Sequence, residues 1–150
     1  MQLQFMAKTL RALTTAAGFL AAGGLIYLLF RPCTLLMFRL VDAFGAMPAL
    51  EKFRGWTSNA GTQLPEWVVY CLPNALWSAA YILTVEAMLR PSRSKLAMAG
   101  IMPVAGAVSE WLQAVGLLRG TFDAVDVVAY VLPYLAYIVY HAYPIKNSLI

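Results

Sequence analysis

The chain has 150 residues, of which 61% are hydrophobic and only 12% are charged, and its formal net charge is +4. Soluble domains carry about 25% charged residues, so this composition excludes an ordinary water-exposed surface and indicates a protein of the lipid bilayer. A basic balance also suits a nucleic-acid-binding protein. Because no basic stripe interleaved with aromatic residues occurs, we expect the partner to be the bilayer and not nucleic acid.

Four segments are long and apolar enough to cross a membrane. Residues 12–30, 67–85 and 127–145 contain no Asp, Glu, Lys or Arg, and residues 96–118 contain no charged residue besides Glu110. A helix of this length rises about 28 Å, which matches a hydrocarbon core of about 30 Å. We therefore predict an all-α bundle of four transmembrane helices in a single membrane domain, residues 1–150, with spans at about 12–30, 67–88, 96–118 and 126–144.

The first segment has features of a secretory signal, since Lys8 and Arg11 precede it. Its apolar run is longer than that of a signal peptide, and Arg31, Pro32 and Cys33 follow it where a signal would have small residues for cleavage. We therefore expect this segment to remain as a membrane anchor.

The distribution of basic residues predicts the orientation. The short connection between the second and third segments carries Arg90, Arg93 and Lys95 and no acid. Short cytoplasmic loops are enriched in Lys and Arg, so this connection and both termini are expected in the cytoplasm. The sequence thus predicts a multi-pass protein of the bacterial inner membrane with an N-in, C-in topology.

The external loop, residues 31–66, contains one amphipathic stretch. Its apolar residues recur at helical spacing: Cys33, Leu36, Met37, Leu40, Val41 and Phe44. Arg39 and Asp42 share the opposite face, so the pattern predicts a helix lying in the membrane interface. A re-entrant or fifth spanning segment is the alternative, which these two charges disfavour. Residues 56–65 predict a polar loop that returns to the membrane.

The third segment is rich in small residues, among them Gly100, Ala105 and Gly106. Small residues allow two helix backbones to approach closely. We therefore expect this helix to occupy the centre of the bundle.

Polar side chains gather in the outer half of the last three spans. They are Asn74 and Ser78 on the second, Glu110 and Gln113 on the third, Arg119 in the following turn, and Asp123, Asp126 and Tyr130 at the start of the fourth. An ionisable group at the centre of a membrane helix costs roughly 2.5–3.5 kcal/mol on insertion scales, so it is seldom kept without a partner or a function. In the predicted topology these residues form an outward-facing pocket, with the external loop above it as a lid.

Structural roles for the same residues stay open. Arg119 is the expected counter-ion of the carboxylates, and the whole group is then interpreted as an ion-pair network with no further function. Asp123 and Asp126 also suit the capping and first turn of a helix. Hydrogen bonding between helices is the corresponding alternative for Asn74 and Ser78.

Metal-site and cofactor motifs are missing from the sequence. No spacing of Cys and His predicts a metal centre, so we expect neither a metal nor a cofactor. Cys33 and Cys71 fall near the outer ends of adjacent spans, where a disulfide could form. Cys71 falls inside the hydrocarbon, however, so both are expected as free thiols. His141 is interpreted as a residue of the cytoplasmic interface.

The order of the polar residues resembles the VanZ-like family of small bacterial membrane proteins. The matching positions are Glu110 and Gln113, then Arg119, Asp123 and Asp126, with Leu72-Pro73-Asn74 on the earlier span. Tyr130 and Pro133 depart from the family, which commonly has Asn and later Gly on the last span. The resemblance covers roughly residues 64–137. It implies a location in the cell envelope and, for the namesake of the family, low-level resistance to the glycopeptide teicoplanin. It implies no agreed reaction.

We therefore expect a VanZ-like envelope protein that binds or modifies a cell-envelope amphiphile or contributes to glycopeptide resistance. Glu110 and Asp126 are the candidate general bases. The ligand would be bound by Asn74, Ser78, Gln113, Arg119, Asp123 and Tyr130. Enzymatic activity stays open, because no Ser/His/Asp order, Cys–His pair or metal triad occurs. One alternative is a non-catalytic subunit that anchors a larger complex with other membrane subunits through a tyrosine stripe on the last span, Tyr130, Tyr134 and Tyr137. Another is a small transporter or proton relay.

Overall fold

The computed structural model describes residues 2–33, 36–61, 64–90 and 92–142. These residues form seven α-helices and no strand, which confirms the all-α prediction. The helices are α1 (Gln2–Phe30), α2 (Leu36–Ala43), α3 (Met47–Gly61), α4 (Glu66–Tyr70), α5 (Leu72–Met88), α6 (Arg93–Ala114) and α7 (Ala124–Ala142). The last two residues of the predicted span 126–144 lie outside the described residues.

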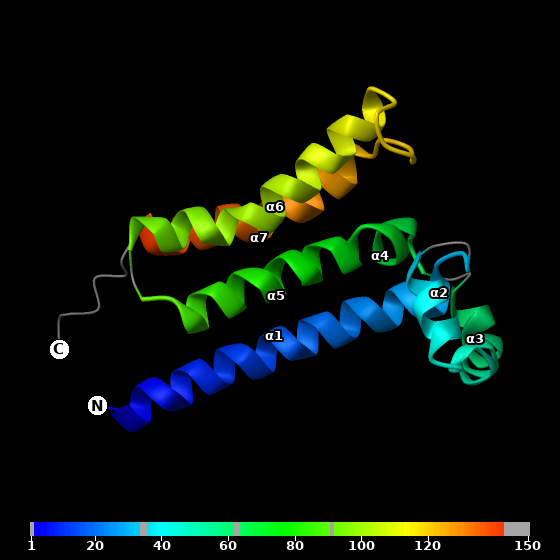
Figure 1. The fold of residues 1–150 in the computed structure, drawn as a ribbon, viewed down its shortest axis with the longest axis horizontal. Helices are drawn as coiled ribbons and strands as arrows, with labels where there is room; N and C mark the ends of the chain where they lie inside the picture. The colour runs from blue at the N-terminus through cyan, green and yellow to red at the C-terminus, as the bar shows by residue number, and fades with distance from the viewer. Residues whose placement is uncertain (1, 34–35, 62–63, 91, 143–150) are drawn as a thin grey trace.

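The four long helices α1, α5, α6 and α7 run side by side and form an elongated bundle (Figure 1). One end of the bundle contains the start of α1, the connection from α5 to α6 and the end of α7. We call it the basic end, after Lys8, Arg90 and Lys95. The other end contains α2, α3, α4 and the turn from α6 to α7, and we call it the acidic end, after Glu110, Asp123 and Asp126.

The central helix is α5, so the prediction that residues 96–118 occupy the centre is wrong. α5 packs against α1, α6 and α7, whereas α6 packs mainly against α5 and α7. The small residues of α6 instead admit tyrosine rings from α7. A Cβ atom at Gly100 would lie 2.7 Å from the ring of Tyr134, and one at Gly106 would meet the ring of Tyr130. The opposite side of α6 stays exposed at Val104 and Val108.

The predicted span 67–88 is divided into two helices at Cys71. Proline lacks the backbone N–H that a helix interior needs but is well placed in a first turn, and Pro73 lies in the first turn of α5. α4 therefore ends at Tyr70 and α5 begins at Leu72. The carbonyl of Cys71 accepts from the N–H groups of Asn74 and Ala75 at 3.1 and 3.2 Å, so this carbonyl keeps backbone partners at the break.

Two described helices are long and apolar enough to cross a membrane, Met6–Phe30 in α1 and Ala124–His141 in α7. A buried core helix of a soluble protein has the same length and composition. Little of either helix is buried here, and Leu20, Leu132 and Leu135 are each more than half exposed. Apolar side chains exposed along a whole helix are stable in lipid and unfavourable in water. The two helices thus point to membrane association, whereas α5 and α6 do not meet the same measure of length and hydropathy.

The amphipathic helix expected in the external loop forms as α2, Leu36–Ala43. It packs on the protein through Phe38, which is 2% exposed and stacks on Tyr27. Leu40 and Phe44, from the predicted apolar stripe, stay exposed. Met37 and Val41 of the same stripe are half-buried, so only part of the stripe points away from the protein.

α3 occupies part of the segment that the sequence predicts as a polar loop, so that prediction is wrong between Trp56 and Gly61. Tertiary contact explains the helix. The guanidinium of Arg54 donates to the carbonyl of Leu28, near the end of α1, where helix carbonyls lack an intrahelical partner. The hydroxyl of Thr57 donates back to the carbonyl of Phe53, so a polar side chain is accommodated within the helix.

Candidate functional site

Glu110 connects the two helices of the acidic end. Its side chain is carried by α6 and the residue is 6% exposed. One carboxylate oxygen accepts from the side-chain amide of Gln113, and the other accepts from the backbone N–H of Asp123, both at 3.2 Å. The charge is therefore held by two neutral donors, and the second bond fixes where α7 begins relative to α6.

The two aspartates at the start of α7 have different roles. A carboxylate oxygen of Asp123 accepts from the N–H of Val125 at 2.8 Å, which is a helix-capping contact. Asp126 lies in the first turn, where a negative charge complements the helix dipole. Its Oδ1 atom is nonetheless buried and accepts no hydrogen bond from the described residues. Capping thus accounts for Asp123 and leaves Asp126 unexplained.

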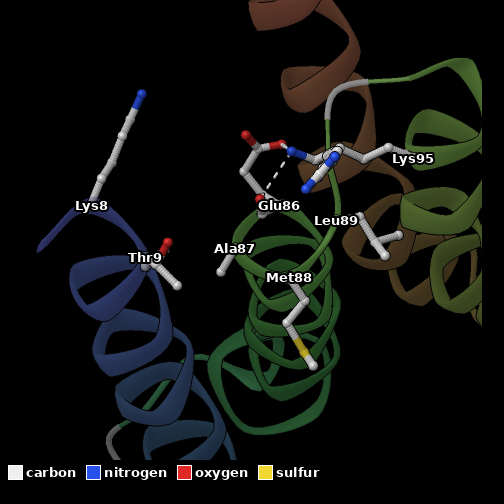
Figure 2. A pocket seen from close by; sticks show the side chains of 9 residues that line it. Lys8, Thr9, Glu86, Ala87, Met88, Leu89 and Lys95 are labelled. Atoms are coloured by element: carbon white, nitrogen blue, oxygen red, sulfur yellow. Dashed lines mark hydrogen bonds and ion pairs between the residues drawn. The ribbon is translucent and has the colours of Figure 1, made fainter. Parts of the chain in front are cut away.

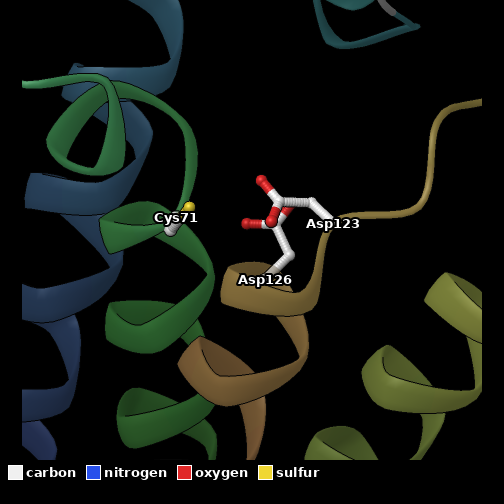
Figure 3. Close-up of side chains that lie close together, drawn as sticks. All are labelled: Cys71, Asp123 and Asp126. Atoms are coloured by element: carbon white, nitrogen blue, oxygen red, sulfur yellow. The ribbon is translucent and has the colours of Figure 1, made fainter.

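Cys71 faces these aspartates from the junction of α4 and α5 (Figure 3). Its Sγ and one oxygen from each of Asp123 and Asp126 all lie within 4.8 Å of one another. The sequence predicts Cys71 only as a free thiol inside the hydrocarbon. The sequence spacing does indicate that Cys71 belongs to the site. Cys71, Asn74 and Ser78 follow one another at intervals of three and four residues, so they share a helix face.

These three ligand atoms are close enough to contact one cation. Thiolates select soft metals, whereas carboxylates select hard ones, so the mixed donor set specifies no particular metal. Both cysteines are free thiols, as the sequence predicts; Cys33 is exposed and Cys71 is buried.

Arg119 does not act as the expected counter-ion. It is exposed, and it forms no ion pair with any carboxylate in the part of the chain that the structure describes. Another arginine approaches the site from α1. The guanidinium of Arg31 donates to the carbonyl of Tyr70 at 2.9 Å and lies 4.7 Å from the centre of its ring. Arg31 thus reaches the residue next to Cys71, across 39 positions of sequence.

Asn74 and Ser78 are buried on the side of α5 that packs in the bundle. The Ser78 hydroxyl donates to the carbonyl of Tyr130 at 2.8 Å, so it joins α5 to α7. This contact matches the structural alternative for Ser78, which is hydrogen bonding between helices.

The acidic end therefore gathers Glu110, Gln113, Asp123 and Asp126, together with Cys71. Among the described residues, none of its carboxylates forms an ion pair with Lys or Arg, so the expected ion-pair network is not present. The loop of residues 31–66, expected as a lid, does not cover the group, because α3 packs against α1 and not over the start of α7. A set of unpaired carboxylates favours a bound cation or a ligand that donates hydrogen bonds.

A second polar cluster, which was not predicted from the sequence, lies at the basic end. Lys95 is 4% exposed, and its Nζ is 2.7 Å from an Oε2 atom of Glu86. The same oxygen accepts from the hydroxyl of Tyr137 at 2.7 Å and lies 3.4 Å from Nε2 of His141. The available signal was Glu86 itself, the one carboxylate between Glu66 and Glu110.

Comparisons of the chain with protein-family models, with curated proteins and with solved structures found no match. The relation to the VanZ-like family therefore stays a prediction from the motif at Glu110, Gln113, Arg119, Asp123 and Asp126.

Proposed function

We propose that the chain is a multi-pass protein of the bacterial inner membrane, crossed by α1, α4–α5, α6 and α7. Large apolar side chains are exposed on the outer sides of α1, α6 and α7, and Trp67 of α4 and Met88 of α5 are exposed at the two ends of the α4–α5 segment. The basic end carries Lys8, Arg11, Arg90 and Lys95, which favours the cytoplasmic side, so the acidic end faces outward. α5 has 17 residues and rises only about 25 Å, and α4 at its outer end supplies the remaining length.

We propose further that the acidic end binds the polar head of a cell-envelope amphiphile. One observation carries this proposal: Oδ1 of Asp126 is buried and unpartnered beside Asp123 and Cys71. A buried carboxylate oxygen without a hydrogen bond costs free energy, which a donor on a ligand would recover. The ligand head therefore offers hydroxyl, amide or ammonium groups. A role in glycopeptide susceptibility would follow from the resemblance to the VanZ-like family.

The tyrosine stripe gives less support to the anchoring-subunit alternative. The hydroxyl of Tyr134 donates to the carbonyl of Leu96, and that of Tyr137 donates to Glu86. These tyrosines thus make their polar contacts within the chain, which leaves less of the stripe for docking another subunit.

The test compares bound amphiphile in three charge-removing variants. Asp126→Asn and Glu110→Gln keep the shape of the side chain, and Glu51→Gln on the exposed surface of α3 is the matched control. Native mass spectrometry of protein in mild detergent should detect an amphiphile that co-purifies with the wild type and the control and is lost from the two site variants. The melting temperature of Asp126→Asn should stay close to the wild type, because Oδ1 of Asp126 accepts no hydrogen bond from the described residues that the change would remove. Glu110→Gln should melt moderately lower, because the amide keeps only one of the two acceptor oxygens that Glu110 uses.

The opposite pattern would reject the proposal. If Asp126→Asn and Glu110→Gln both melt far below the wild type and retain the same bound amphiphile, the acidic end is a structural element. Loss of glycopeptide phenotype in the stable variants would support the link to resistance.

A further inference from the structure

A pocket of about 480 Å³ opens at the basic end, between α1, α5 and the connection to α6. It is separate from the carboxylate group of the acidic end, which lies at the opposite end of the bundle. Figure 2 shows Lys8 on α1 across the opening from Glu86 and Lys95, with its side chain extending away from the helix. The pocket therefore lies where two helices and a basic connection meet.

Three of the four charged side chains that line the pocket are cationic: Lys8, Arg90 and Lys95. The fourth, Glu86, is compensated, because Lys95 pairs with it at 2.7 Å and Tyr137 donates to it. Lys8 and Arg90 are exposed and form no ion pair with any described carboxylate. The pocket thus keeps two uncompensated positive charges, one on α1 and one on the connection to α6.

The remaining lining is largely apolar. Ala12 of α1 and Ala87, Met88 and Leu89 beside Arg90 contribute to it. Met88 and Leu89 are exposed, so their side chains are free to contact an acyl chain. Basic pockets between transmembrane helices on the cytoplasmic side bind the head groups of anionic lipids, and the apolar lining gives the ligand a place for its chain.

We propose that this pocket binds an anionic glycerophospholipid, with Lys8 and Arg90 contacting its phosphate and Met88 and Leu89 contacting its acyl chain. The inference rests on the proposed membrane location but not on the proposed ligand of the acidic end. Lys95 serves as a positioning residue, since it neutralises Glu86 and so removes the one negative charge that would repel the phosphate.

The test measures lipid binding by delipidated protein in neutral detergent. The probes are dioleoylphosphatidylglycerol, dioleoylphosphatidylcholine with the same chains, and inorganic phosphate alone. The variant is Lys8→Gln with Arg90→Gln. The control is Arg39→Gln with Lys52→Gln, which removes two exposed charges at the other end of the bundle. Both double variants lower the net charge equally and leave the buried Lys95–Glu86 pair intact.

The wild type and the control should bind phosphatidylglycerol with equal affinity, and the Lys8/Arg90 variant about thirty-fold more weakly. Binding should weaken as salt is raised, because the contacts are exposed charges. Equal affinity for phosphatidylglycerol in both double variants would overturn the proposal. Equal affinity of the wild type for the two lipids, or for phosphate alone, would show that the pocket does not select an anionic lipid.

The membrane location is tested separately, by alkaline extraction of membranes. If the protein stays in the membrane but the Lys8/Arg90 variant binds lipid normally, this inference alone fails. If the protein is released without detergent, the proposed location fails.

Discussion

Gly23 of α1 lies directly against the indole of Trp77 on α5: a Cβ atom at residue 23 would be 2.6 Å from Nε1 of Trp77. The neighbouring Gly24 has no atom of another segment within 4 Å of the same position. The two glycines are consecutive in one helix and differ in their surroundings. They therefore form a matched pair for testing how closely α1 and α5 pack.

Gly23→Ala should destabilise the protein by about 1–3 kcal/mol, because the added methyl group forces the indole away. Gly24→Ala should be neutral or stabilising by up to about 1 kcal/mol, since alanine favours a helix more than glycine does. Thermal melting in detergent, followed by tryptophan fluorescence, measures both. Equal shifts for the two variants would contradict the packing of α1 on α5 described above.

Glu86→Gln should destabilise the basic end by about 1–3 kcal/mol, because it leaves the buried ammonium of Lys95 without its counter-ion. This is below the cost typical of a fully buried pair, since the side chain of Glu86 is 36% exposed and water solvates part of the loss. Combining it with Lys95→Met should restore much of the stability, because the unpaired charge is removed as well. Melting temperatures of the two single variants and the double variant test this; additive losses would argue against the pair.

Cys33 and Cys71 should react with a maleimide at very different rates in the folded protein. Cys33 is exposed, whereas Cys71 is buried between the helices of the acidic end. Mass spectrometry over time should show one rapid addition, and the second only after unfolding. Reduction before unfolding should not change the mass, because both thiols are free; a gain of two hydrogens would reveal a disulfide.

The proposed topology gives a reporter pattern. A topology reporter inserted in the connection between α5 and α6 should indicate the cytoplasmic side, because this connection carries the basic residues Arg90 and Lys95. A topology reporter inserted at Gly120, between α6 and α7, should indicate the periplasmic side. Cytoplasmic activity at both positions would mean that α6 does not cross the membrane.

Periodicity within one segment was enough to predict α2, because the apolar stripe that ends at Phe44 repeats at the helical spacing. It did not predict α3, whose attachment depends on Arg54 reaching the carbonyl of Leu28, a contact between distant segments. The same limit applies to charge. Arg119 is close to the carboxylates in sequence and was chosen for that reason, whereas Arg31 approaches the site only because α1 packs along α5.

In the candidate site, the sequence predicts the contact of one residue, Glu110, and does not predict that of another, Cys71. Helical spacing and an antiparallel turn predict that Glu110 meets the start of α7, and its oxygen does accept from the N–H of Asp123. Cys71 was placed inside the hydrocarbon without a partner. Its approach to Asp126 depends on the break between α4 and α5, and the position of that break follows from Pro73 in the first turn of α5 and not from hydropathy.

The central position of α5 makes the tolerance of this protein to sequence change uneven. Ala80 and Ser78 on α5 have no exposed surface, so even one added methylene must displace a neighbouring helix. The outer sides of α1 and α7 face lipid tails in the proposed bilayer, where a fluid solvent adapts to any apolar shape. Homologous chains should therefore vary freely among apolar residues at positions such as Leu20 and Leu132, while α5 stays nearly unchanged. Sequence conservation should then follow the packing of α5 more closely than the hydropathy of the four long helices.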